Sequence, residues 1–205
     1  MRTALKHLKK DPVMAKIIAR TGRFAMSYRE PTFETLVRSI VYQQLSGKAA
    51  GTIFGRLQAA SGGGTLTPED VMKLRPERMR KLGLSAQKTI YIRELAKHAR
   101  RGSVVFEKLG NLDDTAVVEH LTQVKGVGVW TAQMFLMFAL RRPDVLPVAD
   151  LGIRAAMKRA YGLAELPKPP EMEAIAARWK PYTSAACWYL WRSLEQKEEP
   201  DGPLN

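Results

Sequence analysis

The sequence predicts an all-α protein. Apolar residues recur at helical spacing along the chain, residues that cap helices precede several of these patterns, and no run alternates apolar and polar residues as a β-strand would. From these patterns we expect about ten helices. With 205 residues the chain can bury a proper core, either as one domain or as two closely packed lobes.

The first half of the chain alternates helical patterns with glycine and proline turns. Thr32, Thr67 and Ser85 each precede such a pattern, where a hydroxyl can accept a hydrogen bond from the first helical turn. After Thr32, the apolar residues and Gln44 fall on one face of a predicted helix. The predicted helices of this half cover residues 12–20, 33–45 and 48–60, a segment after residue 67, and two segments within residues 75–102 that a turn at residue 83 separates.

The second half contains the pattern most typical of a buried helix. Residues 130–140, WTAQMFLMFAL, are apolar on nearly every side. A connector stiffened by Pro143 and Pro147 follows, and a later helical pattern ends at Gly162, as helices often do. The predicted helices of this half cover residues 112–122, 130–140, 151–161, 171–179 and 182–196, before a polar tail.

The chain is strongly basic. Its 33 lysines and arginines against 20 aspartates and glutamates give a net charge of +13 and a pI near 10.0. Such an excess favours a polyanionic partner, and nucleic acid is the commonest one in a cell. An anionic membrane is the alternative, but it calls for a basic amphipathic helix with exposed aromatic residues, and here the basic residues are spread along the chain.

Cysteine and histidine usage limits the chemistry. Cys187 is the single cysteine, which excludes an internal disulfide and a four-cysteine zinc or iron–sulfur site from this chain, and its small apolar neighbours predict a buried side chain. The three histidines lack metal-ligand spacing. The first residues have no apolar core of a secretion signal and no run approaches membrane-spanning length, so we expect a cytoplasmic protein.

Two glycines mark a tight turn between predicted helices. Gly126 and Gly128, in VKGVGVWT, permit backbone conformations that a Cβ forbids and let another molecule come close. The first turn of the following helix offers N–H groups to an anion such as phosphate. An ordinary interhelical turn has the same pattern. The basic chain and an aspartate about twenty residues downstream add support for the phosphate site, and both interpretations stay open at this point.

That aspartate is Asp150, which directly precedes a helical pattern. This position is typical of a helix N-cap. A carboxylate that accepts main-chain N–H bonds is also held ionised and oriented. Capping and a chemical role are therefore compatible, and spacing alone leaves both open.

Three stretches together carry a resemblance to a known family. They are LTQVKGVGVWTAQ followed by VADLGIR, LVRSIVYQQLSGKAAGTI at residues 36–53, and KLGLSAQKTIYIRELA at residues 81–96. They resemble the DNA-3-methyladenine glycosylase II group of the helix-hairpin-helix DNA glycosylase superfamily, in a compact form without the N-terminal β-rich domain of larger members. The resemblance covers nearly the whole chain. It implies one glycosylase unit over residues 1–205, with lobes of approximately residues 31–125 and residues 1–30 plus 126–205, and an active-site cleft between them.

The resemblance implies base excision repair by hydrolysis. Relatives that also cut the DNA backbone carry a lysine two residues after the second glycine, where it forms a Schiff base, but here Trp130 stands there and lyase chemistry is not expected. The expected reaction removes flipped-out alkylated bases of the 3-methyladenine and 7-methylguanine type and leaves an abasic site. Asp150 is the expected catalytic residue, because a carboxylate stabilises an oxocarbenium-like sugar or orients the attacking water. A base that is already cationic needs no second acid.

The same resemblance implies a wedge and a base pocket. Leu45 is the expected wedge that enters the stack when the base leaves it, and a core leucine is the alternative. Trp130 and Trp191 align with aromatic pocket positions that attract a cationic base. Met134 stands where a close relative has tyrosine, which puts the base preference in doubt. Tyr42 is a weaker pocket candidate.

The expected grip on DNA uses main-chain N–H groups and basic side chains, in binding that is largely independent of sequence and sensitive to salt. The expected contacts are Lys125, Gly126, Gly128, Thr131, Lys88 and Arg154. In the family, main-chain carbonyls hold a monovalent cation that bridges to DNA, which implies a structural Na⁺ or K⁺ at Thr122, Val124 and Val127. No other cofactor is expected to be required, and no iron–sulfur cluster.

The expected partner is double-stranded DNA that contains alkylated bases, bound by a monomer near the nucleoid and away from membranes. A non-catalytic helix-hairpin-helix module that grips DNA for a partner is the main alternative, since it shares the charge and the hairpin but has no need of Asp150, a wedge or an aromatic pocket. Removal of oxidised or mismatched bases is a second alternative, which Trp130 and the missing iron–sulfur cysteines disfavour.

Overall fold

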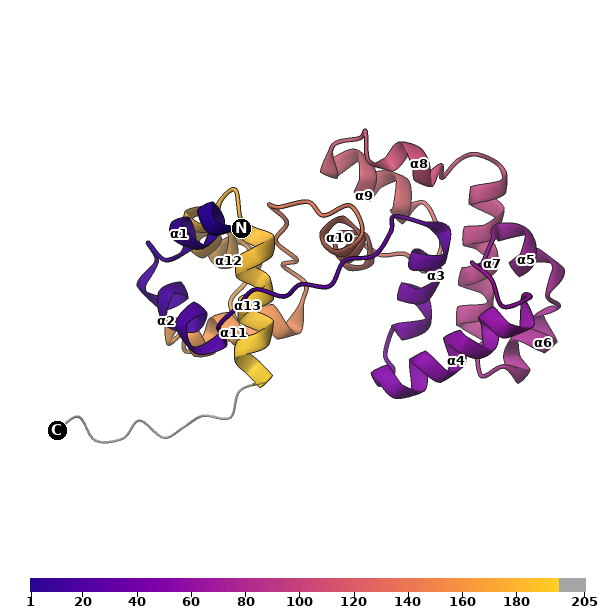
Figure 1. The fold of residues 1–205 in the computed structure, drawn as a ribbon, viewed down its shortest axis with the longest axis horizontal. Helices are drawn as coiled ribbons and strands as arrows, with labels where there is room; N and C mark the ends of the chain where they lie inside the picture. Colours follow the sequence, from indigo (N-terminus) through magenta and orange to yellow (C-terminus); the bar gives the residue numbers. More distant parts are fainter. Residues whose placement is uncertain (196–205) are drawn as a thin grey trace. The chain divides into compact units, whose positions relative to one another are not determined.

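The computed structural model describes residues 1–195, which form thirteen α-helices and one 3₁₀ helix and contain no β-strand (Figure 1). The predicted all-α class is therefore confirmed. The helices that the sequence did not predict are short, and they include α1 (Arg2–Leu8) and α8 (Phe106–Leu109). A helix of one or two turns shows too few repeats for its apolar spacing to be recognised.

The described helices belong to two compact units, and unit 1 joins the two ends of the chain. It consists of Met1–Ser27 and the segment from Arg142 onward. Its longest helix, α13, packs against α2 and α11, and fully buried Tyr189 of α13 donates a hydrogen bond to the main-chain oxygen of Gly22 at 3.0 Å. The helices of unit 1 are α1, α2 (Pro12–Thr21), α11 (Leu151–Tyr161), α12 (Pro169–Ala176), η1 (Ala177–Trp179) and α13 (Thr183–Glu195).

Asp11 ties the two segments of unit 1 together. It is the N-cap of α2, where one carboxylate oxygen accepts from the Val13 N–H at 2.9 Å, and the other accepts from the Tyr161 hydroxyl at 2.5 Å and the Trp179 indole N–H at 3.2 Å. Burial alone would raise the pKa of Asp11, but these hydrogen bonds outweigh it and hold the pKa below its ordinary value. The carboxylate therefore stabilises the unit most when it is ionised.

Replacing Asp11 with asparagine is expected to lower the free energy of unfolding by about 1–3 kcal/mol at neutral pH, because charge-assisted hydrogen bonds are lost. A carboxylate with a depressed native pKa contributes stability above its ordinary pKa and loses it as the pH falls through the native value. The difference between wild type and variant should therefore shrink below about pH 4. Urea unfolding of wild type and variant at pH 7 and at pH 3 measures this difference in unfolding free energy.

The control is Asp113→Asn, at an exposed N-cap that accepts from the Ala116 N–H at 2.8 Å. An equal loss in both variants, or at both pH values, would contradict the prediction.

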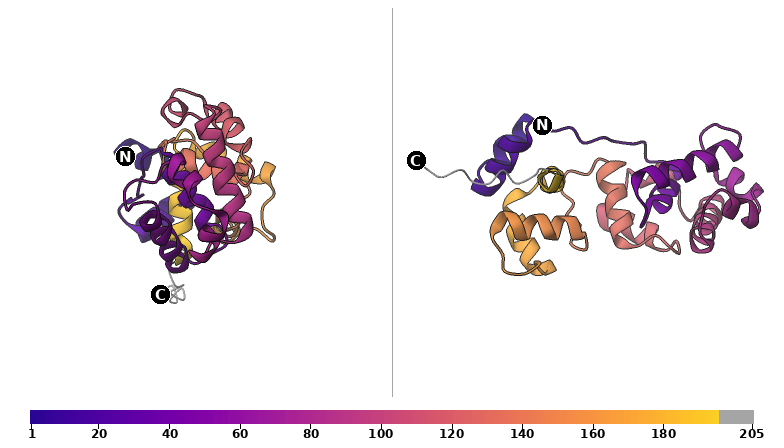
Figure 2. Two further views of the ribbon diagram at one scale, coloured as in Figure 1. Left: turned by 90° about the vertical axis from the view of Figure 1, so that its right-hand side faces the viewer. Right: turned by 90° about the horizontal axis from the view of Figure 1, so that it is seen from below.

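Unit 2 consists of Tyr28–Arg141. Its longest helix is α7, against which α3, α5 and α6 pack, and Figure 2 shows these helices from two further sides. Three buried rings link its helices, since Phe106 lies edge-on to both Phe33 and Phe135, with ring centroids 6.2 and 6.1 Å apart. The helices of unit 2 are α3 (Phe33–Tyr42), α4 (Gly47–Ala60), α5 (Pro68–Lys73), α6 (Pro76–Lys81), α7 (Ala86–Arg100), α8, α9 (Asp114–Thr122) and α10 (Val129–Phe138).

The division between the units differs from the lobes expected from the sequence. Residues 126–141 were expected with the termini, whereas they belong to unit 2. The reason is the packing of α10, which lies against α9 and α3. Both sides of the glycine turn are therefore held within one unit.

Helix α3 ends earlier than predicted. The apolar face of residues 33–41 is buried as expected, but the helix stops at Tyr42, and Gln44 is exposed with φ 56 instead of lying on that face. The prediction for Gln44 was wrong because the chain must reverse direction here, before Ser46 caps α4 by accepting from the Ala49 N–H at 3.3 Å. Residues 43–46 therefore form a short turn, which we call the wedge turn.

Most predicted helix starts are confirmed. The side chains of Thr32, Thr67, Ser85 and Asp150 each accept a hydrogen bond from the first turn of the helix that follows. Cys187 is fully buried as predicted, and burial raises the pKa of its thiol. None of the helices within residues 1–195 is long and apolar enough to cross a membrane.

Candidate nucleic-acid interface and catalytic carboxylate

The turn between α9 and α10 gives the two glycines of the hairpin different roles. Gly126 has φ +93, a conformation that favours glycine, and a Cβ at this position would lie 2.1 Å from Cγ of Tyr91. Gly128 has φ −87, and no heavy atom lies within 4 Å of its would-be Cβ. Gly126 therefore allows the turn to pack on α7, whereas Gly128 leaves open surface at the start of α10.

Helix α10 begins without a capping side chain, because Gly128 is its N-cap. The first turn of an α-helix carries N–H groups that have no acceptor within the helix, and it is the positive end of the helix dipole. Val129 and Trp130 are exposed there, at 53% and 39% of their surface, while Thr131 is buried. This start of α10 has the form that binds an anion such as a phosphate group.

A hollow of about 470 Å³ lies beside this hairpin within unit 2. It is lined by residues 43–44 of the wedge turn, by part of residues 85–91 at the start of α7, and by part of residues 122–128 of the hairpin. Thr122, Val124 and Val127 all belong to this lining, so the three residues expected to offer carbonyls to a cation lie together. The Val124 carbonyl already accepts from the Val127 N–H at 3.0 Å, which leaves room for a second interaction.

Lys88 lies on this lining, but its charged end is engaged by the protein itself. The half-buried side chain donates from Nζ to the main-chain oxygens of Val41 at 2.8 Å and Gln43 at 2.6 Å. Burial lowers the pKa of Lys88. Lys125, by contrast, is exposed on the hairpin turn.

Gln43 is a residue of this interface that the sequence reasoning missed. Its Nε2 donates to the main-chain oxygen of Gly126 at 3.2 Å and to the Thr131 hydroxyl at 3.2 Å. The side chain thus joins the wedge turn to both sides of the hairpin. A glutamine near the end of a predicted helix carries no spacing signal that distinguishes it from its neighbour Gln44, so only the structure identifies it.

The expected wedge, Leu45, is exposed over 41% of its surface. A core position, which was the alternative, is therefore excluded for this leucine. It directly follows Gln44, whose positive φ turns the chain outward.

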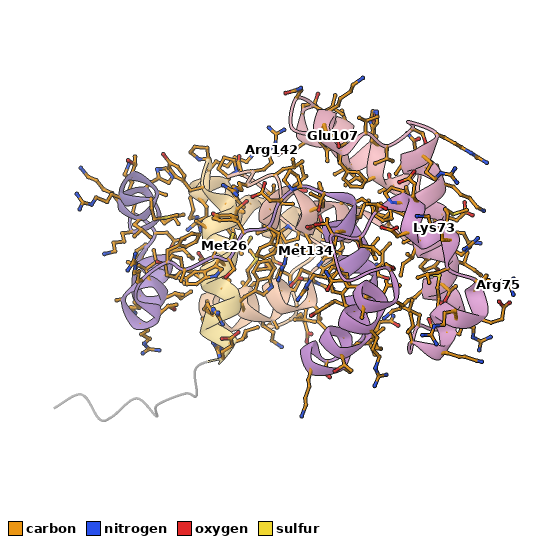
Figure 3. All side chains as sticks on the ribbon, turned by 45° about the vertical axis from the view of Figure 1, so that its right-hand side comes forward. Met26, Lys73, Arg75, Glu107, Met134 and Arg142 are labelled. Carbon is orange, nitrogen blue, oxygen red and sulfur yellow. The ribbon has the colours of Figure 1, made fainter. Side chains whose placement is uncertain are left out.

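The aromatic pocket candidates of unit 2 differ in exposure. Trp130 is exposed and Met134, which Figure 3 labels, is half-buried. The two residues lie four positions apart on α10, so their side chains are neighbours on that helix. Tyr42 is half-buried, and the guanidinium carbon of Arg38 lies 3.6 Å from the centre of its ring. A protein cation thus already covers one face of Tyr42.

In unit 1 the structure brings together Asp150 and Trp191. Oδ1 of Asp150 accepts from the Ile153 N–H at 2.8 Å, which caps α11, and from the Trp191 indole N–H at 2.9 Å. Gly152 packs closely on this pair, since a Cβ there would lie 3.1 Å from both Asp150 Oδ1 and Trp191 Cδ1. The carboxylate is exposed over only 9% of its residue surface and is therefore fixed in direction.

Arg154, the last of the expected DNA contacts, lies on α11 and donates from Nε to the main-chain oxygen of Pro167 at 3.0 Å. The Nε group is thus used within unit 1. Within residues 1–195, no three histidine, cysteine, aspartate or glutamate side chains are grouped so as to hold a metal ion.

A helical fold with a glycine hairpin and a capping aspartate beyond the following helix is matched by a known family model. Residues 37–181 agree with the HhH-GPD superfamily base excision DNA repair proteins, and the chain belongs to this family. The family expected from the sequence is therefore confirmed.

Among individual proteins, DNA-3-methyladenine glycosylase 1 of Schizosaccharomyces pombe is 36% identical over 171 residues, which are 82% of this chain and 75% of that protein. A solved structure of an S. pombe 3-methyladenine DNA glycosylase in complex with abasic DNA superposes with a TM-score of 0.85 at 33% identity, over 95% of this chain and 97% of that one. The structure of DNA-3-methyladenine glycosidase from Bacillus halodurans gives a TM-score of 0.80 at 38% identity, over 91% and 86% of the two chains.

Proposed function

We propose that this protein is a monofunctional DNA glycosylase of base excision repair that hydrolyses the N-glycosidic bond of flipped-out alkylated bases, acting as a monomer and leaving an abasic site. The observation that carries the proposal is the Asp150–Trp191 pair, in a chain of the base excision repair family. Its relatives named as 3-methyladenine glycosylases support the choice of alkylated bases over other lesions.

Asp150 is the catalytic residue of this proposal. As the glycosidic bond breaks, its electron pair leaves with the base and positive charge develops on the sugar. A carboxylate oriented before the reaction stabilises that charge without reorganisation. The oxygen of a water molecule then bonds to the sugar carbon, and the proton that this water loses goes to the solvent. A cationic alkylated base leaves as a neutral molecule, so no second acid is needed.

Trp191 has two roles in the proposal. Its indole N–H holds Oδ1 of Asp150, and its ring offers an electron-rich surface to a cationic base, an interaction of about 0.5–2 kcal/mol. Within unit 2, Trp130 and Met134 of α10 are the apolar residues that the family resemblance assigns to base binding. Tyr42 is the weakest pocket candidate, because the Arg38 guanidinium over its ring opposes a second cation.

The DNA duplex is held at the hairpin of unit 2. The start of α10 at Gly128 and Thr131, the turn at Gly126 and the exposed Lys125 bind phosphates, and Leu45 fills the gap left by the rotated base. The carbonyls of Thr122, Val124 and Val127 would hold a monovalent cation, because main-chain oxygens suit such ions and these residues line one hollow. The cation would add positive charge next to a phosphate.

The absence of lyase chemistry is also part of the proposal. A Schiff base with the sugar requires an amine, and the indole of Trp130 supplies none at the position where relatives with lyase activity carry lysine. The DNA strand should therefore remain intact after base release.

A duplex that carries 7-methylguanine or 3-methyladenine tests the proposal. We expect release of the free base, measured by chromatography, and an intact strand that is cut only after alkali treatment. Strand scission without alkali would contradict the monofunctional assignment. Binding to the duplex without any base release would favour the non-catalytic module, and preferential release from an 8-oxoguanine duplex would favour oxidised bases.

A further inference from the structure

Three segments of unit 2 are joined by hydrogen bonds that start at one lysine. Lys88, on the first turn of α7, donates to the main-chain oxygens of Val41 and Gln43, and the Gln43 side chain donates to Gly126 and Thr131. The end of α3, the start of α7 and the hairpin are therefore linked through Gln43. No single segment could maintain this arrangement by local hydrogen bonds.

We propose that Lys88 is a positioning residue, which fixes the wedge turn against the hairpin through Gln43, and that it does not contact a DNA phosphate. The inference rests on the proposed function, since it concerns how the wedge residue is held while DNA is gripped. It replaces the electrostatic contact with DNA that the sequence suggested for this lysine.

The first observation that supports the proposal is that the Lys88 ammonium points towards main-chain oxygens of the protein. An ammonium has three N–H groups, and two of them are used at 2.8 and 2.6 Å, distances typical of strong hydrogen bonds. The two acceptors are the main-chain oxygens of Val41, in the last turn of α3, and of Gln43, the C-cap of α3, and the carbonyls at this end of a helix favour a cation. Lys88 thus neutralises the negative end of α3, and the lowered pKa agrees with a charge partly removed from water.

The second step is the path from Lys88 to Leu45. Gln43 is held at both its main chain and its side chain, so its position relative to the hairpin is fixed. Gln44 then adopts φ 56, a conformation that non-glycine residues rarely adopt without support from their surroundings. Leu45 follows immediately and is exposed. The network therefore sets where the wedge stands with respect to the phosphate-binding turn.

The salt dependence of DNA binding separates a positioning lysine from a phosphate contact. Each lysine that neutralises a phosphate contributes about −0.9 to the slope of log affinity against log salt concentration. For Lys88→Met we expect a slope equal to that of wild type, and single-turnover base release slower by about tenfold or more because the wedge is misplaced. The positive control is Lys125→Met, for which the slope should become shallower by about 0.9. A slope change of that size in Lys88→Met would overturn the proposal.

Two further variants sharpen the test. Lys88→Arg keeps a positive charge that would serve a phosphate contact equally well, but its planar fork does not reproduce the two hydrogen bonds to Val41 and Gln43, so it should fail to restore base release. Gln43→Leu should reproduce the slow base release of Lys88→Met, and the double variant should be no slower than the slower single one, because both remove one network. Full rescue by arginine, or additive losses, would contradict the inference.

Two measurements keep the test independent of folding and of the proposed function. Thermal unfolding of each variant identifies loss of the fold, and Lys73→Met on α5, where Lys73 is exposed and paired with Asp70 at 3.5 Å, should leave base release unchanged (Figure 3). The fluorescence of 2-aminopurine next to an abasic-site analogue reports insertion of the wedge without catalysis. If wild type released no base, the slope and this fluorescence would still decide the role of Lys88, and an undiminished fluorescence change in Lys88→Met would overturn it.

Discussion

Replacing Asp150 with asparagine is expected to slow base release by a factor of about 10²–10³ while DNA affinity and folding are retained. Asparagine caps a helix as well as aspartate does, and its side-chain oxygen can accept from the Ile153 N–H and the Trp191 indole N–H. The change removes the negative charge that would face the sugar and replaces the second carboxylate oxygen with an NH₂ group. Single-turnover release from an alkylated duplex and binding to an abasic duplex measure the two properties separately.

The alanine variant serves as the control for the helix cap. Asp150→Ala removes the charge and the cap together, so it should lose base release and also about 0.5–2 kcal/mol of stability. If Asp150→Asn retained base release within a few-fold of wild type, the Asp150 carboxylate would only cap α11 and would have no catalytic role. Tighter DNA binding in the asparagine variant would indicate that the carboxylate already repels the DNA in the ground state.

Replacing Gly126 with alanine is expected to have the largest effect on the hairpin. The Cβ would lie 2.1 Å from the Tyr91 ring, and φ +93 is strained for any residue with a side chain. Strain of about 1–3 kcal/mol adds to overpacking of about 1–3 kcal/mol, so the unfolding free energy should fall and the turn should shift away from α7. DNA affinity is then expected to drop by at least about tenfold, because in the proposed function the turn presents the groups that bind phosphate. Chemical unfolding and fluorescence anisotropy with labelled duplex measure the two effects.

Gly128→Ala is the matched control, two residues away in the same turn. With φ −87 and no heavy atom within 4 Å of the added Cβ, its stability should stay within about 0.5 kcal/mol of wild type. A loss of DNA affinity in this variant without loss of stability would indicate that a phosphate comes close to position 128. Equal stability of the two alanine variants would show that the turn does not depend on the conformation of Gly126.

The parts of the fold that could be predicted are those fixed by local sequence. Capping hydroxyls at Thr32, Thr67 and Ser85 and the continuous apolar pattern of α10 depend on neighbours along the chain, and they were predicted correctly. The end of α3 was not, because Gln44 takes its conformation in a turn that Lys88 holds from another helix. Tertiary contacts of this kind have no periodic signature.

In the candidate site, too, the features carried by local sequence motifs could be predicted, and those that depend on tertiary contacts could not. A resemblance in motifs directed attention to Asp150, Trp191 and the hairpin glycines, and the structure adds that one indole holds the carboxylate. The resemblance in motifs could not indicate that the Lys88 ammonium faces the protein, because an isolated lysine in a basic chain is typical of an exposed surface charge. Gln43 escaped notice for a related reason: a polar side chain whose partners lie more than eighty positions further along the chain leaves no trace in its own neighbourhood.

Gly152 limits which residues the chain can carry next to the Asp150–Trp191 pair. Even a methyl group there would press on the oxygen of Asp150 and on the ring of Trp191 at 3.1 Å each, so the two would have to part by a few tenths of an ångström. Substitution at position 152 is thus expected to disturb the Asp150–Trp191 hydrogen bond without altering either of the two residues. At position 152, the hydrogen atom that glycine has in place of a side chain is what leaves Asp150 and Trp191 room for their hydrogen bond.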